Sequence, residues 1–249
     1  QVLDVNVGLP DIDEPSLMEQ TVKALQSVVD LPLQLDSSNP AALERGLRAY
    51  NGKPIVNSVN GEESVLRNIL PLCKKYGAAV VGLTLDQSGI PPKAEGRFAI
   101  ARRITEAALA AGIPREDIYI DCLTLTASAQ QEAVVETLKA IRMCKQQLGV
   151  RTVLGVSNIS FGLPCRTYLN TAFFTLAMYE GLDLAIINPS SSEMMAARAA
   201  FRVLTNRDAK SMDYVNAYAG MTTVSTLQAA GAAAPAVQAA AGGSLGAAI

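Results

Sequence analysis

Carboxylate and amide side chains recur at the ends of short apolar runs along this chain. Each run is short enough to form one buried strand, and a helix-like stretch follows most of them. Carboxylates accept hydrogen bonds, whereas amides both donate and accept them, so together they suit a flat heterocycle with N–H and C=O edges. Several clustered acids could instead hold Mg²⁺, but the share of amides favours a neutral polar ligand. The residues concerned are Asp4, Asn6, Asp36, Asn57, Asn60, Asp86, Asp121, Asn158 and Asn188.

The chain has no histidine among its 249 residues. Ser-His-Asp and Cys-His hydrolysis, His-ligated zinc and a His axial ligand to a corrinoid or haem are therefore excluded within it. Acid–base chemistry must come from Asp, Glu, Lys, Tyr or solvent.

The four cysteines form no Cys-x-x-Cys pair, which argues against a zinc knuckle or a thioredoxin motif. Cys73 and Cys144 lie in helix-like stretches and are predicted to be buried and inert. Cys122 follows Asp121 and Cys165 precedes Arg166, so both are predicted to line the mouth of the site. Arg166 itself could bind an anionic group or orient a carboxylate, or it could be a solvated charge at a helix start.

The order of these elements predicts a parallel sheet with helices between its strands. Strands are expected near 2–8, 32–36, 54–59, 78–85, 117–121, 152–157 and 183–188. Helices are expected over 16–29, 41–50, 62–76, 93–111, 128–148, 166–180, 192–204 and 209–218. The length and the alternation predict a TIM (β/α)8 barrel, whose active site lies at the carboxyl ends of its strands. Only seven strands are found, so the first βα unit is expected to be missing from this chain.

Composition limits the remaining possibilities. The net charge of −2, without a basic stripe, argues against nucleic acid as a partner. No apolar run reaches the roughly 20 residues that span a bilayer, and no secretory segment opens the chain, which favours a cytoplasmic location. Residues 1–220 are expected to form the barrel. Residues 221–249, rich in Ala and Gly, are expected to be a linker to a further domain or a tail.

The ordered motifs resemble the pterin-binding barrel of methyltetrahydrofolate-dependent, corrinoid-linked methyltransferases. That family includes the folate-binding domain of cobalamin-dependent methionine synthase. The resemblance covers residues 1 to about 218 and is carried by Leu-Asp-Val-Asn-Val-Gly at 3–8, Leu-Asp-Ser-Ser at 35–38, Val-Asn-Ser-Val-Asn-Gly at 56–61, Gly-Leu-Thr at 82–84, Tyr-Ile-Asp at 119–121 and Leu-Gly-Val-Ser-Asn-Ile-Ser at 154–160. The family's Gly-Glu-Arg-Ile-Asn motif on the first strand is absent here.

The resemblance implies a role for each matching residue. Asp36, Asn57 and Asp121 would bind the pterin edge, and Asn158 would lie near N5, the nitrogen that carries the methyl group. The rest of the implied folate-binding set is Gly155 and Ser157 at the floor, Ile186 against the ring, and Asp4 and Asn6. Arg166 would support the network around N5. The chain departs from the family at Cys122, where proline is common, and at Cys165.

The implied reaction transfers the N5-methyl group of methyltetrahydrofolate to cob(I)alamin. Asn158, Asp121 and Arg166 are the expected catalytic residues, with the proton for N5 coming through Asp121 and water. Because the chain lacks an Asp-x-His-x-x-Gly motif, a separate protein or domain would carry the corrinoid. The resemblance also allows a homodimer.

Three other readings remain open at this point. Dihydropteroate synthase is a related pterin barrel, although its resemblance implies an Arg-x-His motif that is absent here. The chain could instead be a non-catalytic folate-binding module of a multidomain methyltransferase. It could also be a TIM barrel that acts on another small polar molecule.

Overall fold

The computed structural model describes residues 1–221 and shows one curled sheet of seven parallel strands. Each strand pairs with the next along the chain, from β1 to β7. The strands are β1 (Leu3–Asn6), β2 (Leu33–Asp36), β3 (Ile55–Val59), β4 (Ala79–Leu83), β5 (Ile118–Asp121), β6 (Arg151–Gly155) and β7 (Leu184–Ile186). The expected linker, apart from residue 221, lies outside the described residues.

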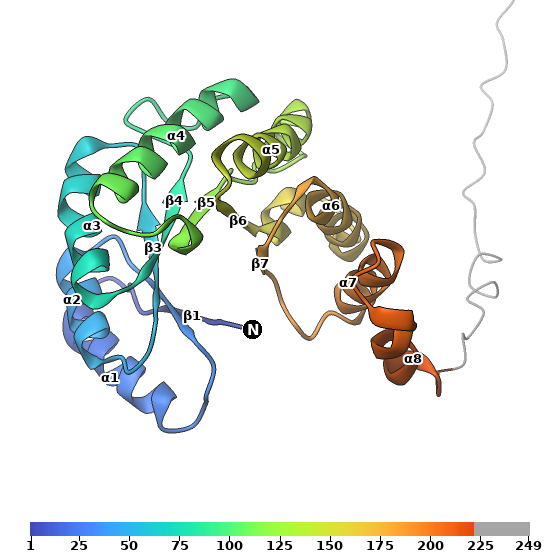
Figure 1. Cartoon of the computed structure of the whole chain (residues 1–249), viewed down its shortest axis with the longest axis horizontal. Helices are drawn as coiled ribbons and strands as arrows, with labels where there is room; N and C mark the ends of the chain where they lie inside the picture. The colour runs from blue at the N-terminus through green and yellow to red at the C-terminus, as the bar shows by residue number, and fades with distance from the viewer. Residues whose placement is uncertain (222–249) are drawn as a thin grey trace, which may run out of the picture.

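Helices follow the strands and cover the outer face of the sheet (Figure 1). They are α1 (Glu14–Gln26), α2 (Pro40–Ala49), α3 (Glu63–Tyr76), α4 (Ala94–Ala110), α5 (Glu132–Met143), α6 (Arg166–Glu180), α7 (Ser192–Leu204) and α8 (Met212–Tyr218). The architecture is a partial TIM barrel, because β1 and β7 are the two edges of the sheet in the described residues. The predicted fold class is confirmed.

Local sequence signals explain where several helices begin and end. Asp13 accepts a hydrogen bond from the main-chain N–H of Ser16 at the start of α1, and Asn39 accepts one from Ala41 at the start of α2. Gly77 ends α3 in the left-handed conformation, at φ +66°. Within residues 1–221 no helix combines the length and apolar composition needed to cross a membrane.

Several expected boundaries were wrong by two or more residues, and two of them lie close to the site. The sixth strand ends at Gly155 rather than residue 157, because Val156–Ser160 form a 3-10 turn, η3. Helix α5 begins at Glu132 rather than residue 128. Thr126 and Ser128 instead donate side-chain hydrogen bonds to the carbonyl of Phe161, which keeps this stretch in a loop.

Side chains alternate between two apolar layers along each strand. One layer packs between the sheet and the helices and includes Val5, Leu35 and Val56. The other lies inside the barrel and includes Ile55 and Val153. The polar side chains at the strand ends share the inward-facing positions, so this alternation carries them to the mouth above the inner apolar layer.

Candidate functional site

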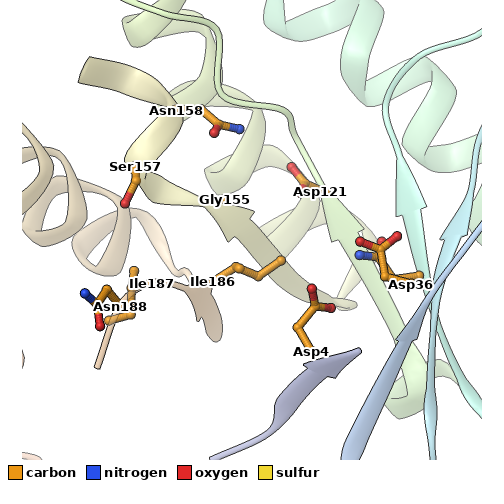
Figure 2. A pocket seen from close by; sticks show the side chains of 10 residues that line it. Asp4, Asp36, Asp121, Gly155, Ser157, Asn158, Ile186, Ile187 and Asn188 are labelled. Atoms are coloured by element: carbon orange, nitrogen blue, oxygen red, sulfur yellow. The ribbon is translucent and has the colours of Figure 1, made fainter. Parts of the chain in front are cut away.

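A cavity of about 400 Å³ opens at the carboxyl ends of the strands. This is a usual size for a small-molecule site. Its lining consists of Asp4, Asp36, Asn57, Asp121, Gly155, Ser157, Asn158, Ile186, Ile187 and Asn188. Figure 2 shows the carboxylates of Asp4, Asp36 and Asp121 on one side of the cavity, and Ser157, Asn158 and Asn188 on the other. Of the implied folate-binding and catalytic residues, the structure therefore brings together all except Asn6 and Arg166.

Strand register places Asn6, Asp36 and Asn57 side by side on β1, β2 and β3. The side-chain amide of Asn6 donates to Asp36 Oδ2 at 3.0 Å. Asn6 therefore orients Asp36 instead of lining the cavity, which corrects its expected role as a direct contact. One level deeper, the Gln34 side chain donates to Asp4 Oδ1 at 2.6 Å.

Asp121 is the most enclosed carboxylate of the cavity, with 8% of the residue exposed. Its burial raises the pKa of the carboxyl to about 7, against the opposing effects of the Leu123 N–H and the positive charge of Arg97. The Leu123 N–H donates to Asp121 Oδ1 at 2.7 Å. A carboxyl with this pKa can both hold and release a proton near neutral pH.

Asp4 lies on the edge strand β1, and the residue as a whole is exposed. Its carboxylate nevertheless faces the cavity, and the partial loss of water raises the pKa of Asp4. The charge of Asp36 raises this pKa further, while the hydrogen bond from Gln34 lowers it. Asp4 and Asp36 thus form a pair of acids on one wall.

The η3 turn presents Ser157 and Asn158 to the cavity, so Ser157 is a turn residue and not the end of the expected strand. A side-chain carbon at Gly155 would lie 3.3 Å from Asn158 Nδ2, tighter than usual contact. Glycine at this position therefore leaves room for the Asn158 amide.

Arg166 holds the η3 turn from outside the cavity. Its Nε donates to Ser160 Oγ and its Nη2 to the Ser157 carbonyl, both at 2.9 Å. The guanidinium also lies 4.5 Å from the centre of the Phe161 ring. Arg166 thus remains exposed, and through these contacts it supports the turn that carries Asn158.

Two other expected mouth residues serve structure instead. Asn60 accepts a hydrogen bond from the Glu62 N–H at 2.9 Å, before α3. Cys122 is completely buried, and its sulfur lies 3.9 Å from that of Cys144. The expectation that Cys122 lines the mouth was therefore wrong. Cys165 is exposed but does not line the cavity.

The cysteines give a direct check on this arrangement. Cys165 alone is exposed, whereas burial raises the pKa of Cys73 to about 12 and contact with Cys144 raises that of Cys122. Because thiolates are the reactive form, we expect one thiol to react rapidly with Ellman's reagent in the folded protein, and all four after denaturation. Cys165→Ser should abolish the rapid phase. Two rapid thiols in the wild type would contradict the burial of Cys73, Cys122 or Cys144.

Comparison with known proteins identifies related sequences. A family model described as pterin binding enzyme matches residues 1–188. Methionine synthase from Mycobacterium leprae is 38% identical over 186 residues, covering 70% of this chain but only 15% of that protein. Methylcorrinoid:tetrahydrofolate methyltransferase from Eubacterium limosum is 30% identical over 222 residues, covering 87% of this chain and 81% of that protein.

Solved structures support the fold. A dihydropteroate synthase from Yersinia pestis with a pterine-sulfa conjugate superposes with a TM-score of 0.65, covering 82% of this chain and 83% of that one. The sequence identity is 16%, so this likeness speaks for a shared barrel architecture and not for a shared reaction.

Proposed function

The chain belongs to the pterin-binding enzyme family, and on that premise we propose that it transfers the N5-methyl group of methyltetrahydrofolate to cob(I)alamin on a corrinoid protein or domain. One observation carries the proposal. Asp36, Asn57, Asp121 and Asn158 come from four separate segments and line the same cavity of about 400 Å³. Their donors and acceptors match the N–H and carbonyl edges of a pterin.

The lining divides into groups that bind the ring and groups that act at N5. Asp36, oriented by Asn6, and Asn57 accept and donate hydrogen bonds along the pterin edge. Ile186, whose side chain extends toward the centre of the cavity, supplies an apolar contact for the ring face (Figure 2). We assign Asn158 and Asp121, which line the same cavity, to the methyl-bearing nitrogen.

The methyl transfer needs help at the leaving nitrogen. The bond between N5 and the methyl carbon breaks, its electron pair stays on N5, and the carbon bonds to the incoming cobalt. A tertiary amine leaves poorly unless N5 gains a proton. Asp121, with a pKa of about 7, holds such a proton at neutral pH and passes it to N5 through water. Asn158 adds a hydrogen bond that strengthens as charge develops.

The same groups would serve the reaction in either direction, because forward and reverse transfer share one transition state. This matters because the E. limosum relative is named for transfer between a methylcorrinoid and tetrahydrofolate. The chain spans about 15% of the length of the M. leprae methionine synthase, so we do not extend the proposal to that protein's final product.

Titration of the purified chain with methyltetrahydrofolate, followed by free cob(I)alamin, tests the proposal. We expect saturable binding and conversion of the cobalt spectrum to that of methylcobalamin. A variant with alanine at both Asp36 and Asn57 provides the negative control, because it lacks two acceptors for the pterin edge. The reverse mixture, methylcobalamin with tetrahydrofolate, establishes the preferred direction.

The outcomes separate the competing functions. Binding without turnover in either direction would favour a non-catalytic folate-binding module. Absence of binding by a folded sample would overturn the proposal. Condensation of a dihydropterin pyrophosphate with p-aminobenzoate would instead identify a dihydropteroate synthase.

A further inference from the structure

Arg97, on α4, is a completely buried charged side chain that does not line the cavity. All of its hydrogen-bond partners are neutral. Its Nε donates to the Pro91 carbonyl at 2.9 Å, and its Nη1 donates to Thr137 Oγ1 at 2.6 Å. The same Nη1 donates to the carbonyls of Cys122 at 2.9 Å and Leu123 at 3.0 Å. Its Nη2 has no partner.

Packing alone does not account for a guanidinium at this position. Removing a charge from water is costly, and an apolar side chain of the same length would fill the space without that cost. The guanidinium also stays protonated, since arginine does not lose its proton in proteins. We therefore expect this buried positive charge to position or stabilise a functional group close to it.

The carbonyls of Cys122 and Leu123, which accept hydrogen bonds from Arg97 Nη1, belong to the two residues directly after Asp121. The Leu123 N–H in turn donates to Asp121 Oδ1 at 2.7 Å. On the other side, the Asp121 carbonyl accepts from the N–H of Thr84 at 3.0 Å and from its hydroxyl at 3.1 Å. Thr137 ties α5 to the same segment, because its hydroxyl lies 3.1 Å from the Leu123 carbonyl. Arg97 thus fixes the main chain that determines where the Asp121 carboxylate lies.

We propose that Arg97 is a positioning residue for Asp121, holding residues 121–123 in place and supplying the buried positive charge that acts on the Asp121 carboxylate. The inference deepens the proposed function, because it concerns the proton that Asp121 would exchange. It stands on hydrogen-bond geometry that is independent of any substrate.

Among the charged and titratable groups around Asp121, Arg97 is the principal positive charge that acts on the Asp121 carboxylate. Asp4 of β1 and Asp36 of β2 share its cavity, and the thiols of Cys122 and Cys144 lie behind it. Glu136 of α5 acts on Arg97, but it is itself bound by the Ala94 N–H and by Lys139, with Lys93 nearby. Arg97 lowers the pKa of Asp121 against the effect of burial.

Direct titration of Asp121 tests the proposal without any substrate. Protein labelled with ¹³C at the aspartate carboxyls is titrated by NMR, and Asp121→Asn assigns the signal. The wild-type midpoint is expected at about 7. Arg97→Met should raise it by up to about one pH unit, because the positive charge of Arg97 opposes the effect of burial on the Asp121 carboxyl. Arg97→Lys keeps the positive charge, so its Asp121 midpoint should lie close to that of the wild type.

Two further variants keep the experiment decisive. Arg102→Met removes an exposed positive charge from the same helix and leaves Arg97 in place, so its midpoint should match that of the wild type. Arg97→Gln retains N–H donors for the main-chain carbonyls and replaces Arg97→Met if that variant does not fold. An unchanged midpoint in the folded neutral variant would overturn the proposal.

The same variants distinguish failure of the proposed methyl transfer from failure of the positioning role. If methyl transfer occurs, the pH at which its rate falls should move with the NMR midpoint in each variant. If no methyl transfer occurs but the midpoint still moves, the positioning role stands and the proposed reaction does not.

Discussion

Asn158→Ala is expected to lower the rate of methyl transfer by about 100- to 1000-fold, the usual cost of removing a donor that stabilises developing charge. Methyltetrahydrofolate binding should weaken by less than about 10-fold, because one neutral hydrogen bond contributes roughly 1 kcal/mol. The difference follows from the proposed role of Asn158 at N5, on η3 at one side of the cavity. There it can strengthen its hydrogen bond as N5 gains an electron pair.

The experiment compares single-turnover rates with equilibrium binding of methyltetrahydrofolate. Asn188→Ala is the matched control, because Asn188 is another amide of the same lining and follows β7 instead of β6. We expect that control to change the transfer rate by less than about 10-fold. Equal losses of binding and rate in Asn158→Ala would show that Asn158 holds the ring and does not act at N5.

The arrangement of Asp36 and Asn57 could be predicted from the sequence because it depends on two local rules. A short apolar run sets the end of each strand, and parallel strands bring those ends to one edge of the barrel. Register then places Asp36 beside Asn57. Neither step needs a long-range contact to be known in advance, so the cavity lining was largely predictable.

The burial of Cys122 follows from a local signal in the sequence. Successive side chains on a strand point to opposite faces, so a residue next to the inward-facing Asp121 must face the helices. The structure buries Cys122 against Cys144 on that side. The alternation that predicted Asp121 at the mouth also predicts that Cys122 lies away from it.

Arg97 and the η3 turn could not be predicted in the same way. The partners of Arg97 in the loop after β5 are main-chain carbonyls, which carry no signature of residue type. In sequence the residue looks like any helix arginine. Likewise, the support that Arg166 gives to η3 depends on the carbonyl of Ser157, and this becomes visible only when the loop is folded.

The burial that equips Asp121 for proton transfer should also destabilise the folded protein at neutral pH. The folded state binds the Asp121 proton more tightly than the unfolded state does, with a pKa of about 7 against 3.8. The tighter proton binding stabilises the folded state fully below about pH 4, and this stabilisation is lost as the pH rises through 7. Asparagine cannot ionise, and it can still accept the Leu123 N–H. The free energy of unfolding of Asp121→Asn is therefore expected to exceed that of the wild type by up to about 4 kcal/mol at pH 8. This figure follows from about 1.4 kcal/mol per unit of pKa difference.

Urea denaturation of both proteins between pH 4 and pH 8 measures this difference as a function of pH. The advantage of Asp121→Asn should grow with pH and level off above 7, while its methyl transfer should fall, because the variant cannot donate a proton to N5. Asp4→Asn should show an advantage of the same sign, since burial also raises the pKa of Asp4. A stability difference that does not change with pH would mean that Asp121 is as well hydrated in the folded protein as in the unfolded chain. A more stable but inactive Asp121→Asn would show instead that the site keeps a buried acid at the expense of stability.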